Sequence, residues 1–485
     1  MGLLTLLLAC PLAGMLVVLV LPRTAVRAIR LVALVATGLT LVLGLELLRA
    51  FDPSQPGLQF QERLAWIPQL RIFYHVGVDG LNLSMVLLTV LLGFLACMAS
   101  WTIAERQKEY FVLYLLLEAG MLGTFLAMDL FLFYVFWEVV LVPMYFLIGI
   151  WGGGRREYSA FKFFVYTLAG SLAMLLGILA LYFQTGSFDL VALSRTAPGL
   201  AASLQTWLFL AFFLGFAIKV PIFPFHTWLP DAHVDAPTPI SVLLAGVLLK
   251  MGGYGFFRIA YPLFPEGAQA FGWLLAVLGM VNIVYGAFVA MAQTDFKRLV
   301  AYSSVSHMGF VLLGLASLTP AGLNGAMLQM FNHGIITGGM FLLVGVLYER
   351  THTRDLQAFG GLGARIPVYG GVLMFFSLAS LGLPGLSGFV GEFLSLIGGF
   401  GVWRWQTVGS VLGIVVAAAY MLKVIQQVLW GPLDERWRAI PDMTAWEICS
   451  ILPLLLLVLG LGLYPLPLLN LQDPALLRLI AHVIR

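Results

Sequence analysis

Apolar runs long enough to cross a membrane recur along the whole chain, and few folds can accommodate them. A helix of about 18–20 apolar residues spans the hydrocarbon core of a bilayer, and in lipid a helix satisfies its own backbone hydrogen bonds. Composition agrees, because only 10% of the 485 residues are charged, whereas soluble domains contain about 25%. We therefore predict an all-α integral membrane protein without a soluble domain.

Hydropathy predicts about 14 transmembrane helices of roughly 20 residues each. The proline-containing connection 49–78 also has alternating apolar residues, which favour a hairpin on the membrane surface. The tail after Pro474 has apolar residues at helical spacing and is expected in the interface. The expected spans are 2–21, 27–48, 79–100, 110–128, 129–150, 160–184, 205–230, 238–260, 272–292, 299–318, 324–348, 368–397, 407–430 and 446–468.

Basic residues predict the orientation. Of the 26 Lys and Arg residues, 15 fall in the odd-numbered connections and eight on the opposite side, so the odd connections face the cytoplasm and both termini face outward. The first run has no cleavage pattern behind it, so it is expected to be a span rather than a removable signal. The net charge of +3 is too small to indicate a nucleic-acid partner.

Several charged or titratable residues lie inside the predicted spans. A charge at the membrane centre costs about 2.5–3.5 kcal/mol on insertion scales, so each is a candidate functional residue. They are Lys219, Lys250, Lys423, Glu118, Glu138, Glu392, His307 and His333.

Lys219 stands directly before a predicted helix break. In the stretch GFAIKVPIFPFHTW, Pro221 and Pro224 interrupt the seventh span and are expected to free the carbonyls of Ala217 and Val220. Irregular backbone at membrane depth is tolerated only where protein encloses it or water reaches it. We therefore expect a broken helix lining a wet cavity, with Lys219 at the break.

A second break is predicted in the twelfth span, at LASLGLPGLSGFVGE. Pro384 interrupts the helix and Glu392 follows it. Two interrupted spans in corresponding places indicate a transport site between repeats. We predict inverted five-helix repeats, spans 4–8 and 9–13, and four regions: 1–105, 106–261, 262–431 and 432–485.

The buried groups predict a proton path along the membrane plane, in the order Glu138, Lys219, Lys250, the histidines His307 and His333, and Glu392. Burial and a neighbouring carboxylate shift the protonation of a lysine in opposite directions, so such a pair can act as a switch.

Other interpretations of the same residues remain open. Glu138 and Lys219 form a static ion pair in one alternative, and the two histidines are satisfied core residues or haem ligands in another. Lys423 is a secondary site or reaches the surface, and the role of Glu118 stays open. A hydrated entrance is favoured over a metal site for Asp231, His233 and Asp235.

Metal, phosphate and disulfide sites are not predicted. The cysteines Cys10, Cys97 and Cys449 lie far apart in apolar runs and form no zinc-binding spacing. The glycine-rich stretch 382–393 lies inside a hydrophobic helix, where phosphate binding is not expected.

Four stretches carry a resemblance to a known family. They are FWE at 136–138, FHTWLPDAHVDAPTPISVLLAGVLLK at 225–250, DFKRLVAYSSVSHMG at 295–309 and NHGIITGGMFLLVG at 332–345. They resemble the antiporter-like membrane subunits of respiratory complex I over essentially the whole chain. The chain is most similar to the M-type subunits, because it lacks the lateral helix of the L type and has Glu392 where L, N and antiporter relatives have lysine.

The resemblance implies 14 helices with inverted repeats and a proton path through the matching residues. Glu138 and Lys219 would be the coupling pair, and Glu392 the outward exit. It implies a translocase subunit of a bacterial cytoplasmic membrane with no redox centre of its own. NADH, FMN, iron–sulfur clusters and quinone would belong to partner subunits, among them further antiporter-like ones. The alternatives are a subunit of a multisubunit cation/proton antiporter or of a membrane-bound hydrogenase-type complex.

Overall fold

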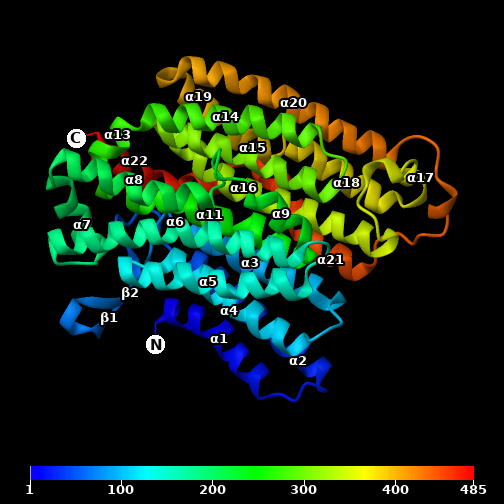
Figure 1. The fold of residues 1–485 in the computed structure, drawn as a ribbon, viewed down its shortest axis with the longest axis horizontal. Helices are drawn as coiled ribbons and strands as arrows, with labels where there is room; N and C mark the ends of the chain where they lie inside the picture. Colours follow the sequence, from blue (N-terminus) through cyan, green and yellow to red (C-terminus); the bar gives the residue numbers. More distant parts are fainter. Residues whose placement is uncertain (1, 485) are drawn as a thin grey trace.

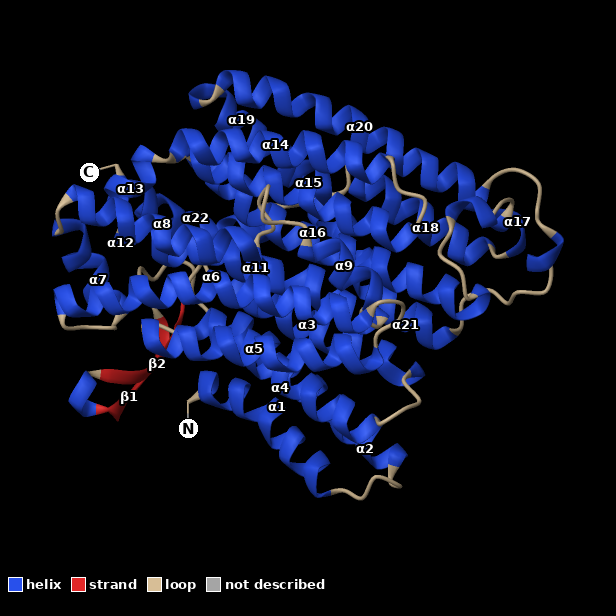
Figure 2. Ribbon diagram, in the orientation of Figure 1, coloured by secondary structure: helices blue, strands red, loops and turns tan. Residues whose placement is uncertain are grey.

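The computed structural model describes residues 2–484 of the chain. Long helices lie side by side along one direction and make up nearly all of the molecule (Figure 1). The strands of that described part form one antiparallel pair at the edge of the helical bundle (Figure 2).

The helices of the first half follow the predicted spans closely. Their bounds are α1 (Leu3–Val20), α2 (Val26–Ala50), α3 (Leu83–Ala99), α4 (Gln107–Leu126), α5 (Leu130–Trp151), α6 (Arg156–Thr185), α7 (Leu190–Thr196), α8 (Ala202–Lys219), α9 (Trp228–Asp235), α10 (Thr238–Leu243), α11 (Leu249–Gly255), α12 (Tyr261–Leu263) and α13 (Pro265–Ala270). Two π-helical stretches, Leu244–Leu248 and Phe256–Ala260, join α10, α11 and α12 into one span, Thr238–Leu263.

The second half continues the bundle. It contains α14 (Gly272–Met291), α15 (Phe296–Ser317), α16 (Pro320–Thr351), α17 (Leu362–Arg365), α18 (Pro367–Ser380), α19 (Ser387–Val402), α20 (Arg404–Leu429), α21 (Ala445–Leu463) and α22 (Leu466–Val483). Within residues 2–484, thirteen helices are long and apolar enough to cross a membrane. The shorter α18 and α19 occupy the predicted twelfth span 368–397, so the expected total of about 14 spans is confirmed.

The bundle has two distinct ends. We call one the hairpin end, where strands β1 (Gln59–Ile67) and β2 (Ile72–Val78) pair as the proline-containing connection predicts. The chain begins and ends there: Glu62 accepts hydrogen bonds from Leu4 N and Thr5 N, both at 3.0 Å, and Gln269 donates to the Val483 carbonyl at 2.5 Å.

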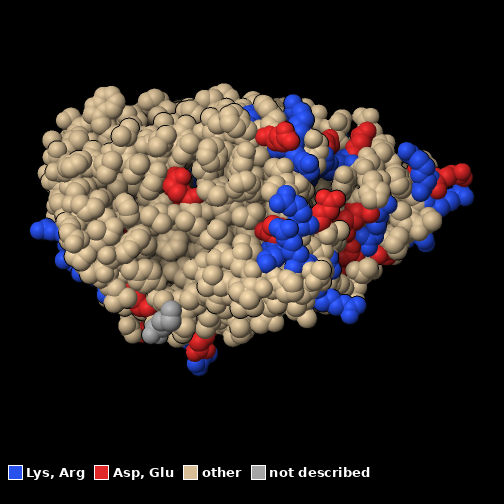
Figure 3. Space-filling view, turned by 60° about the horizontal axis from the view of Figure 1, so that its bottom comes forward, with Lys and Arg blue, Asp and Glu red and all other residues tan. Residues whose placement is uncertain are grey.

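We call the opposite end the charged end. Figure 3 shows Lys, Arg, Asp and Glu gathered toward this side, where α17 and α21 lie in Figure 1. Its ion pairs include Arg23–Glu109 at 2.6 Å and Arg354–Asp295 at 3.2 Å. The charge asymmetry along the bundle axis agrees with the distribution predicted from the connections.

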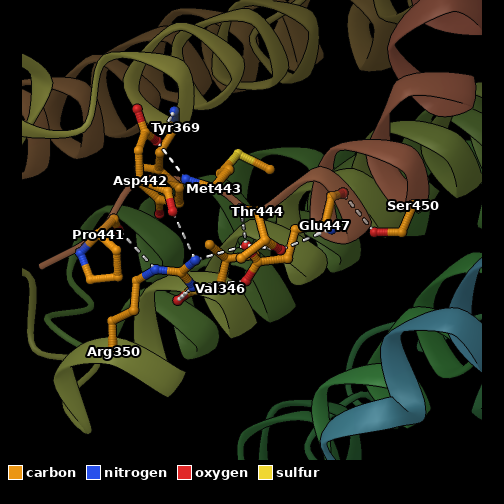
Figure 4. A network of polar contacts seen from close by, with 9 residues as sticks. All are labelled: Val346, Arg350, Tyr369, Pro441, Asp442, Met443, Thr444, Glu447 and Ser450. Atoms are coloured by element: carbon orange, nitrogen blue, oxygen red, sulfur yellow. Dashed lines mark hydrogen bonds and ion pairs between the residues drawn. The ribbon is translucent and has the colours of Figure 1, made fainter.

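Arg350 fastens three helices together at the charged end (Figure 4). From the last turn of α16 it forms a two-pronged ion pair with Glu447 of α21, both bonds at 2.7 Å, and donates to the Pro441 carbonyl at 3.0 Å. Asp442 in turn accepts from the first backbone amides of α18, Val368 N at 2.8 Å and Tyr369 N at 3.0 Å. The network fixes the start of α21 against the bundle.

The C-terminal helix α22 packs along α16 and, at the hairpin end of the bundle, against the ends of other helices. Asn324, near the start of α16, donates to Asp473 at 2.6 Å, and His482 lies 2.9 Å from the Pro262 carbonyl. The apolar spacing of the tail therefore serves packing against protein as well as exposure at the surface.

Candidate functional site

The first helix break lies where the sequence predicts it. Helix α8 ends at Lys219, and α9 begins at Trp228. The predicted freeing of the Ala217 carbonyl is wrong, because this oxygen accepts from Ile222 N at 2.8 Å in a wider turn. Instead the Ile218 carbonyl leaves the helical pattern and accepts from the Trp228 indole at 2.9 Å.

A side chain from the second half closes this break. The Asn282 amide, on α14, accepts from Phe223 N at 2.8 Å and donates to the Pro221 carbonyl at 3.1 Å. The irregular backbone is therefore satisfied by protein, as membrane depth requires.

Lys219 lies in an aromatic setting at the C-terminal end of α8. The residue is 2% exposed, and its ammonium lies 5.0 Å from the ring centroid of Trp137 and 5.9 Å from that of Phe163. Such rings attract a cation through their faces. The negative end of the helix dipole also favours the cation at this position.

Glu138 follows Trp137 on α5, but it forms no ion pair with Lys219. Within residues 2–484, no ion pair of 4.0 Å or less joins Glu138 to Lys219, and the buried Oε1 of Glu138 has no hydrogen-bond partner. The static ion pair considered from the sequence is therefore not the arrangement in this structure.

Lys250 connects the two halves of the molecule. It is fully buried on α11, between the two π-helical stretches, and its ammonium lies 2.6 Å from Nδ1 of His333 on α16. The same ammonium also donates to the Ala245 carbonyl. A contact between residues 83 apart in sequence thus links the first predicted repeat to the second.

His307 and Glu392 form the next contact. His307 on α15 lies 2.9 Å from the Glu392 carboxylate through Nδ1 and 3.2 Å from the Ser380 hydroxyl through Nε2. The rings of His307 and His333 are 5.8 Å apart between centroids. Lys250, His333, His307 and Glu392 therefore lie in sequence across the centre of the bundle.

The second break positions Glu392. Helix α18 ends at Ser380 and α19 begins at Ser387, and Gly382 and Gly385 between them have φ of +81° and +94°. Glycine suits these left-handed conformations because it has no Cβ. The break presents Ser380 to one nitrogen of His307 while Glu392, in the second turn of α19, meets the other.

The geometry disfavours the haem alternative. Both nitrogens of His307 are engaged by protein groups, and Nδ1 of His333 is engaged by Lys250. The two histidines line one internal cavity between α15, α16, α18 and α19. The other residues around that cavity are Gln329, Ile336, Thr337, Ala379, Ser380, Gly388 and Glu392.

Comparison with known proteins identifies the family of the chain. The family model for the transmembrane region of NADH:quinone oxidoreductase and Mrp antiporters matches residues 127–418. Subunit M of NADH-quinone oxidoreductase from Rhodobacter capsulatus is 47% identical over 471 residues, 95% of this chain and 91% of the relative. The chain belongs to the subunit M family. The resemblance carried by its motifs is confirmed.

Further relatives place the family more widely. NADH-ubiquinone oxidoreductase chain 4 of Arabidopsis thaliana is 40% identical over 479 residues, 98% of this chain and 96% of the relative. A chain in the structure of respiratory complex I from Thermus thermophilus with bound NADH superposes with a TM-score of 0.91 at 34% identity, covering 99% of both chains. The predicted antiporter-like fold is thereby confirmed.

A more distant likeness concerns the fold alone. A chain of the Mrp complex from Dietzia has a TM-score of 0.87 at 22% identity, over 100% of both chains. The same fold is therefore present in a chain of the Mrp complex.

The three residues predicted to form a hydrated entrance, Asp231, His233 and Asp235, lie in different environments. Asp231 pairs with Lys162 at 2.8 Å and Arg298 at 3.2 Å at the charged end. His233 is instead fully buried and stacks on Phe341 with ring centroids 4.6 Å apart. Asp235 lines a cavity of about 200 Å³ at the charged end and accepts from the Ser159 hydroxyl at 2.5 Å.

The remaining buried candidates stand apart from the central line. Lys423 donates to the Met291 carbonyl at 2.9 Å and the Gln293 carbonyl at 3.3 Å, at the end of α14. Glu118 is fully buried on α4, and neither carboxylate oxygen has a hydrogen-bond partner in the described part of the chain.

Two buried cations escaped the sequence analysis. Lys297 is 4% exposed and donates to the Ala236 carbonyl at 2.5 Å, although the connection beside it led us to count it as a cytoplasmic surface residue. Arg258, counted as an outward-facing residue, is buried in an ion pair with Asp79. Its position in the last three residues of the predicted span 238–260 gave no sign of this pairing, since its partner lies 179 residues away in sequence.

Proposed function

We propose that the chain is the proton-translocating subunit M of a bacterial NADH–quinone oxidoreductase, and that protons cross it through Glu138, Lys219, Lys250, His333, His307 and Glu392. Membership of the subunit M family supports the pumping role. The main support for the route is the pair of contacts between Lys250 and His333, at 2.6 Å, and between His307 and Glu392, at 2.9 Å.

The route divides into an input part and an output part. Lys219 stands at the first break, within reach of electrostatic influence from Glu138 but without a fixed partner. Movement of the Lys219 ammonium between the Trp137 ring and the Glu138 carboxylate changes the electrostatic potential at Lys250. Approach of the two groups favours the protonated lysine, and separation disfavours it.

The central contacts allow proton exchange between side chains. The Lys250 ammonium donates toward His333 Nδ1, and an imidazole can take up a proton on one nitrogen and release one from the other. His333 and His307 line the same small internal cavity, with their ring centroids 5.8 Å apart. His307 then passes the proton to Glu392, whose neutral form can release it toward the hairpin end.

The electrostatic energies are large enough for pumping against the membrane potential. Moving one charge across 100 mV costs about 2.3 kcal/mol. At an effective dielectric constant of about 20, two unit charges 4 Å apart interact by about 4 kcal/mol. Switching a single ion pair along the route is therefore large enough to drive one proton against the membrane potential.

The charged end is assigned to the cytoplasm and the hairpin end to the outside, which places both termini outside a bacterial cytoplasmic membrane. The asymmetry of basic residues supports this orientation. The four regions 1–105, 106–261, 262–431 and 432–485 are then an N-terminal module, two inverted repeats and a last span with its tail.

The energy for pumping comes from partner subunits. Members of this subunit family carry no redox cofactor, so NADH, FMN, iron–sulfur clusters and quinone are assigned to other chains of the complex. Further antiporter-like subunits are the expected neighbours within the membrane.

Lys219→Ala tests the proposal. In an assembled complex reconstituted into vesicles, the variant should lower the number of protons pumped per electron while NADH–quinone electron transfer continues. Lys423→Ala is the matched control, since it removes a lysine held by carbonyls away from the route. A wild-type proton-to-electron ratio in the Lys219→Ala complex would refute the route.

A further inference from the structure

A second row of polar side chains begins at Lys250, and the proposed proton route does not use it. Tyr254 and Arg258 follow Lys250 at intervals of four residues on the same span. Residues four apart lie on one face of a helix. The row runs from the centre of the bundle to the hairpin end, so it marks a direct way from the central lysine to the outside.

The far end of this row is closed by an ion pair. Arg258 forms two bonds to Asp79, at 2.9 Å through one terminal nitrogen and at 2.5 Å through the other. The two side chains are only 12% and 9% exposed. Asp79 directly follows β2, in the short connection to α3, so the pair joins this connection to the end of the Thr238–Leu263 span.

Each polar atom at this closure is occupied. Nε of Arg258 donates to the Tyr254 hydroxyl at 2.9 Å, and that hydroxyl donates to the Phe125 carbonyl at 3.0 Å. The Asp79 carboxylate also accepts from Leu81 N at 2.9 Å. A guanidinium does not lose its proton in proteins, and a backbone carbonyl has no proton to pass on. The row therefore ends in groups that cannot relay a proton.

The direction of Lys250 agrees with a closed row. Its ammonium contacts the Ala245 carbonyl and His333, on the side of the preceding helical turn, rather than Tyr254. Side chains in a helix lean toward its N-terminus. In this span that direction is the charged end, away from the closure.

We propose that Asp79, Arg258 and Tyr254 form a seal that closes the span of Lys250 toward the outside, so that a proton on Lys250 leaves through His333. The inference rests on the proposed route. A carboxylate alone at this place would bind and release protons, and Arg258 occupies both of its oxygens. A buried ion pair adds little net stability over apolar residues of similar volume, so anchoring alone does not explain its presence.

Three variants of the whole complex test the seal in vesicles. Arg258→Gln frees the Asp79 carboxylate and should speed the passive collapse of an imposed pH gradient, without NADH, by about tenfold or more, since a charge-assisted hydrogen bond is worth at least one tenfold step. Adding Asp79→Asn to that variant removes the freed carboxylate and should restore the slow collapse. Lys423→Gln, the matched loss of a carbonyl-bound cation, should leave it slow.

Restoration of slow collapse by Asp79→Asn distinguishes a seal from a purely structural ion pair, because the double variant still lacks the ion pair. If the complex with Arg258→Gln fails to assemble, Arg258→Lys serves instead, because one ammonium cannot engage both carboxylate oxygens; it should leak to an intermediate degree. Slow collapse in both Arg258 variants overturns the seal, and so does a double variant that leaks as fast as Arg258→Gln. Since the measurement needs no turnover, its result is distinct from the pumping test of Lys219→Ala.

Discussion

Replacing Glu392 by glutamine isolates the charge at the proposed outlet. The side chain is 6% exposed, and its carboxylate lies 2.9 Å from Nδ1 of His307. Glutamine has nearly the same shape and can still accept a hydrogen bond from His307 or Gln329. The substitution therefore removes charge and proton binding while it preserves packing, and the complex should assemble.

The distance sets the size of the effect. At 2.9 Å and an effective dielectric constant of about 20, an imidazolium and a carboxylate attract each other by about 6 kcal/mol. That is more than twice the roughly 2.3 kcal/mol needed to move one charge through 100 mV. Without it, a proton on His307 loses its main electrostatic partner, and nothing at position 392 can accept the proton.

We expect the Glu392→Gln complex to lose most of the proton transport that passes through this subunit. Glu392→Lys should keep a measurable fraction, because an amine can bind and release a proton and related subunits have lysine at this break. The measurement is proton uptake in reconstituted vesicles, normalised to the rate of electron transfer. Normal pumping by the glutamine variant would refute the outlet, and Glu118 would then be the next candidate.

Three further changes test other parts of the structure. Glu138→Gln should lower the proton-to-electron ratio as loss of its partner lysine does, whereas Glu138→Asp keeps the charge and should retain part of it; equal, near-normal ratios would contradict the switch. Arg350→Ala removes the charged hydrogen bonds to Glu447 and should destabilise the complex by about 1–3 kcal/mol, seen as a lower thermal midpoint with unchanged pumping per assembled complex. Burial raises the pKa of Asp189, but hydrogen bonds from His75 and from a backbone amide outweigh it and hold this pKa below its ordinary value. The ionised Asp189 carboxylate therefore stabilises the fold above about pH 4, and this contribution is lost as the pH falls through the lowered pKa. Asp189→Asn should speed hydrogen exchange of the β1–β2 hairpin at neutral pH. The difference in exchange rate between the variant and wild type should vanish in acid.

The spans and the breaks could be predicted because their causes are local. A proline inside a helix removes a backbone hydrogen bond, and together with the glycines around Pro384 it places the end of α18 within a few residues of the expected break. The surface hairpin followed from alternation and prolines in one connection. The fate of the Ala217 carbonyl could not be predicted, because it depends on a wider turn through Ile222 that only the folded backbone defines.

The candidate site residues could be named from the sequence, but the contacts between them could not. Buried charge alone marks Lys250 and Glu392, because the cost of placing charge in a membrane is a property of each residue. The pairing of Lys250 with His333 instead depends on how α11 packs against α16, across 83 residues of sequence. Arg258 shows the same limit: near a span end it resembles an interfacial residue, and only the position of Asp79 makes it a buried pair.

The placement of the central contacts follows from burial. The Thr238–Leu263 and Pro320–Thr351 spans are wholly enclosed, with 100% of their apolar windows buried, whereas Ala445–Leu463 at the periphery is 22% buried. A charged relay on a peripheral helix would face lipid, where no side chain can satisfy it. The two enclosed spans carry Lys250 and His333, and their contact is the one place in the route where the two predicted repeats exchange a hydrogen bond. On the proposed route, a proton therefore passes between the halves within protein and does not meet lipid.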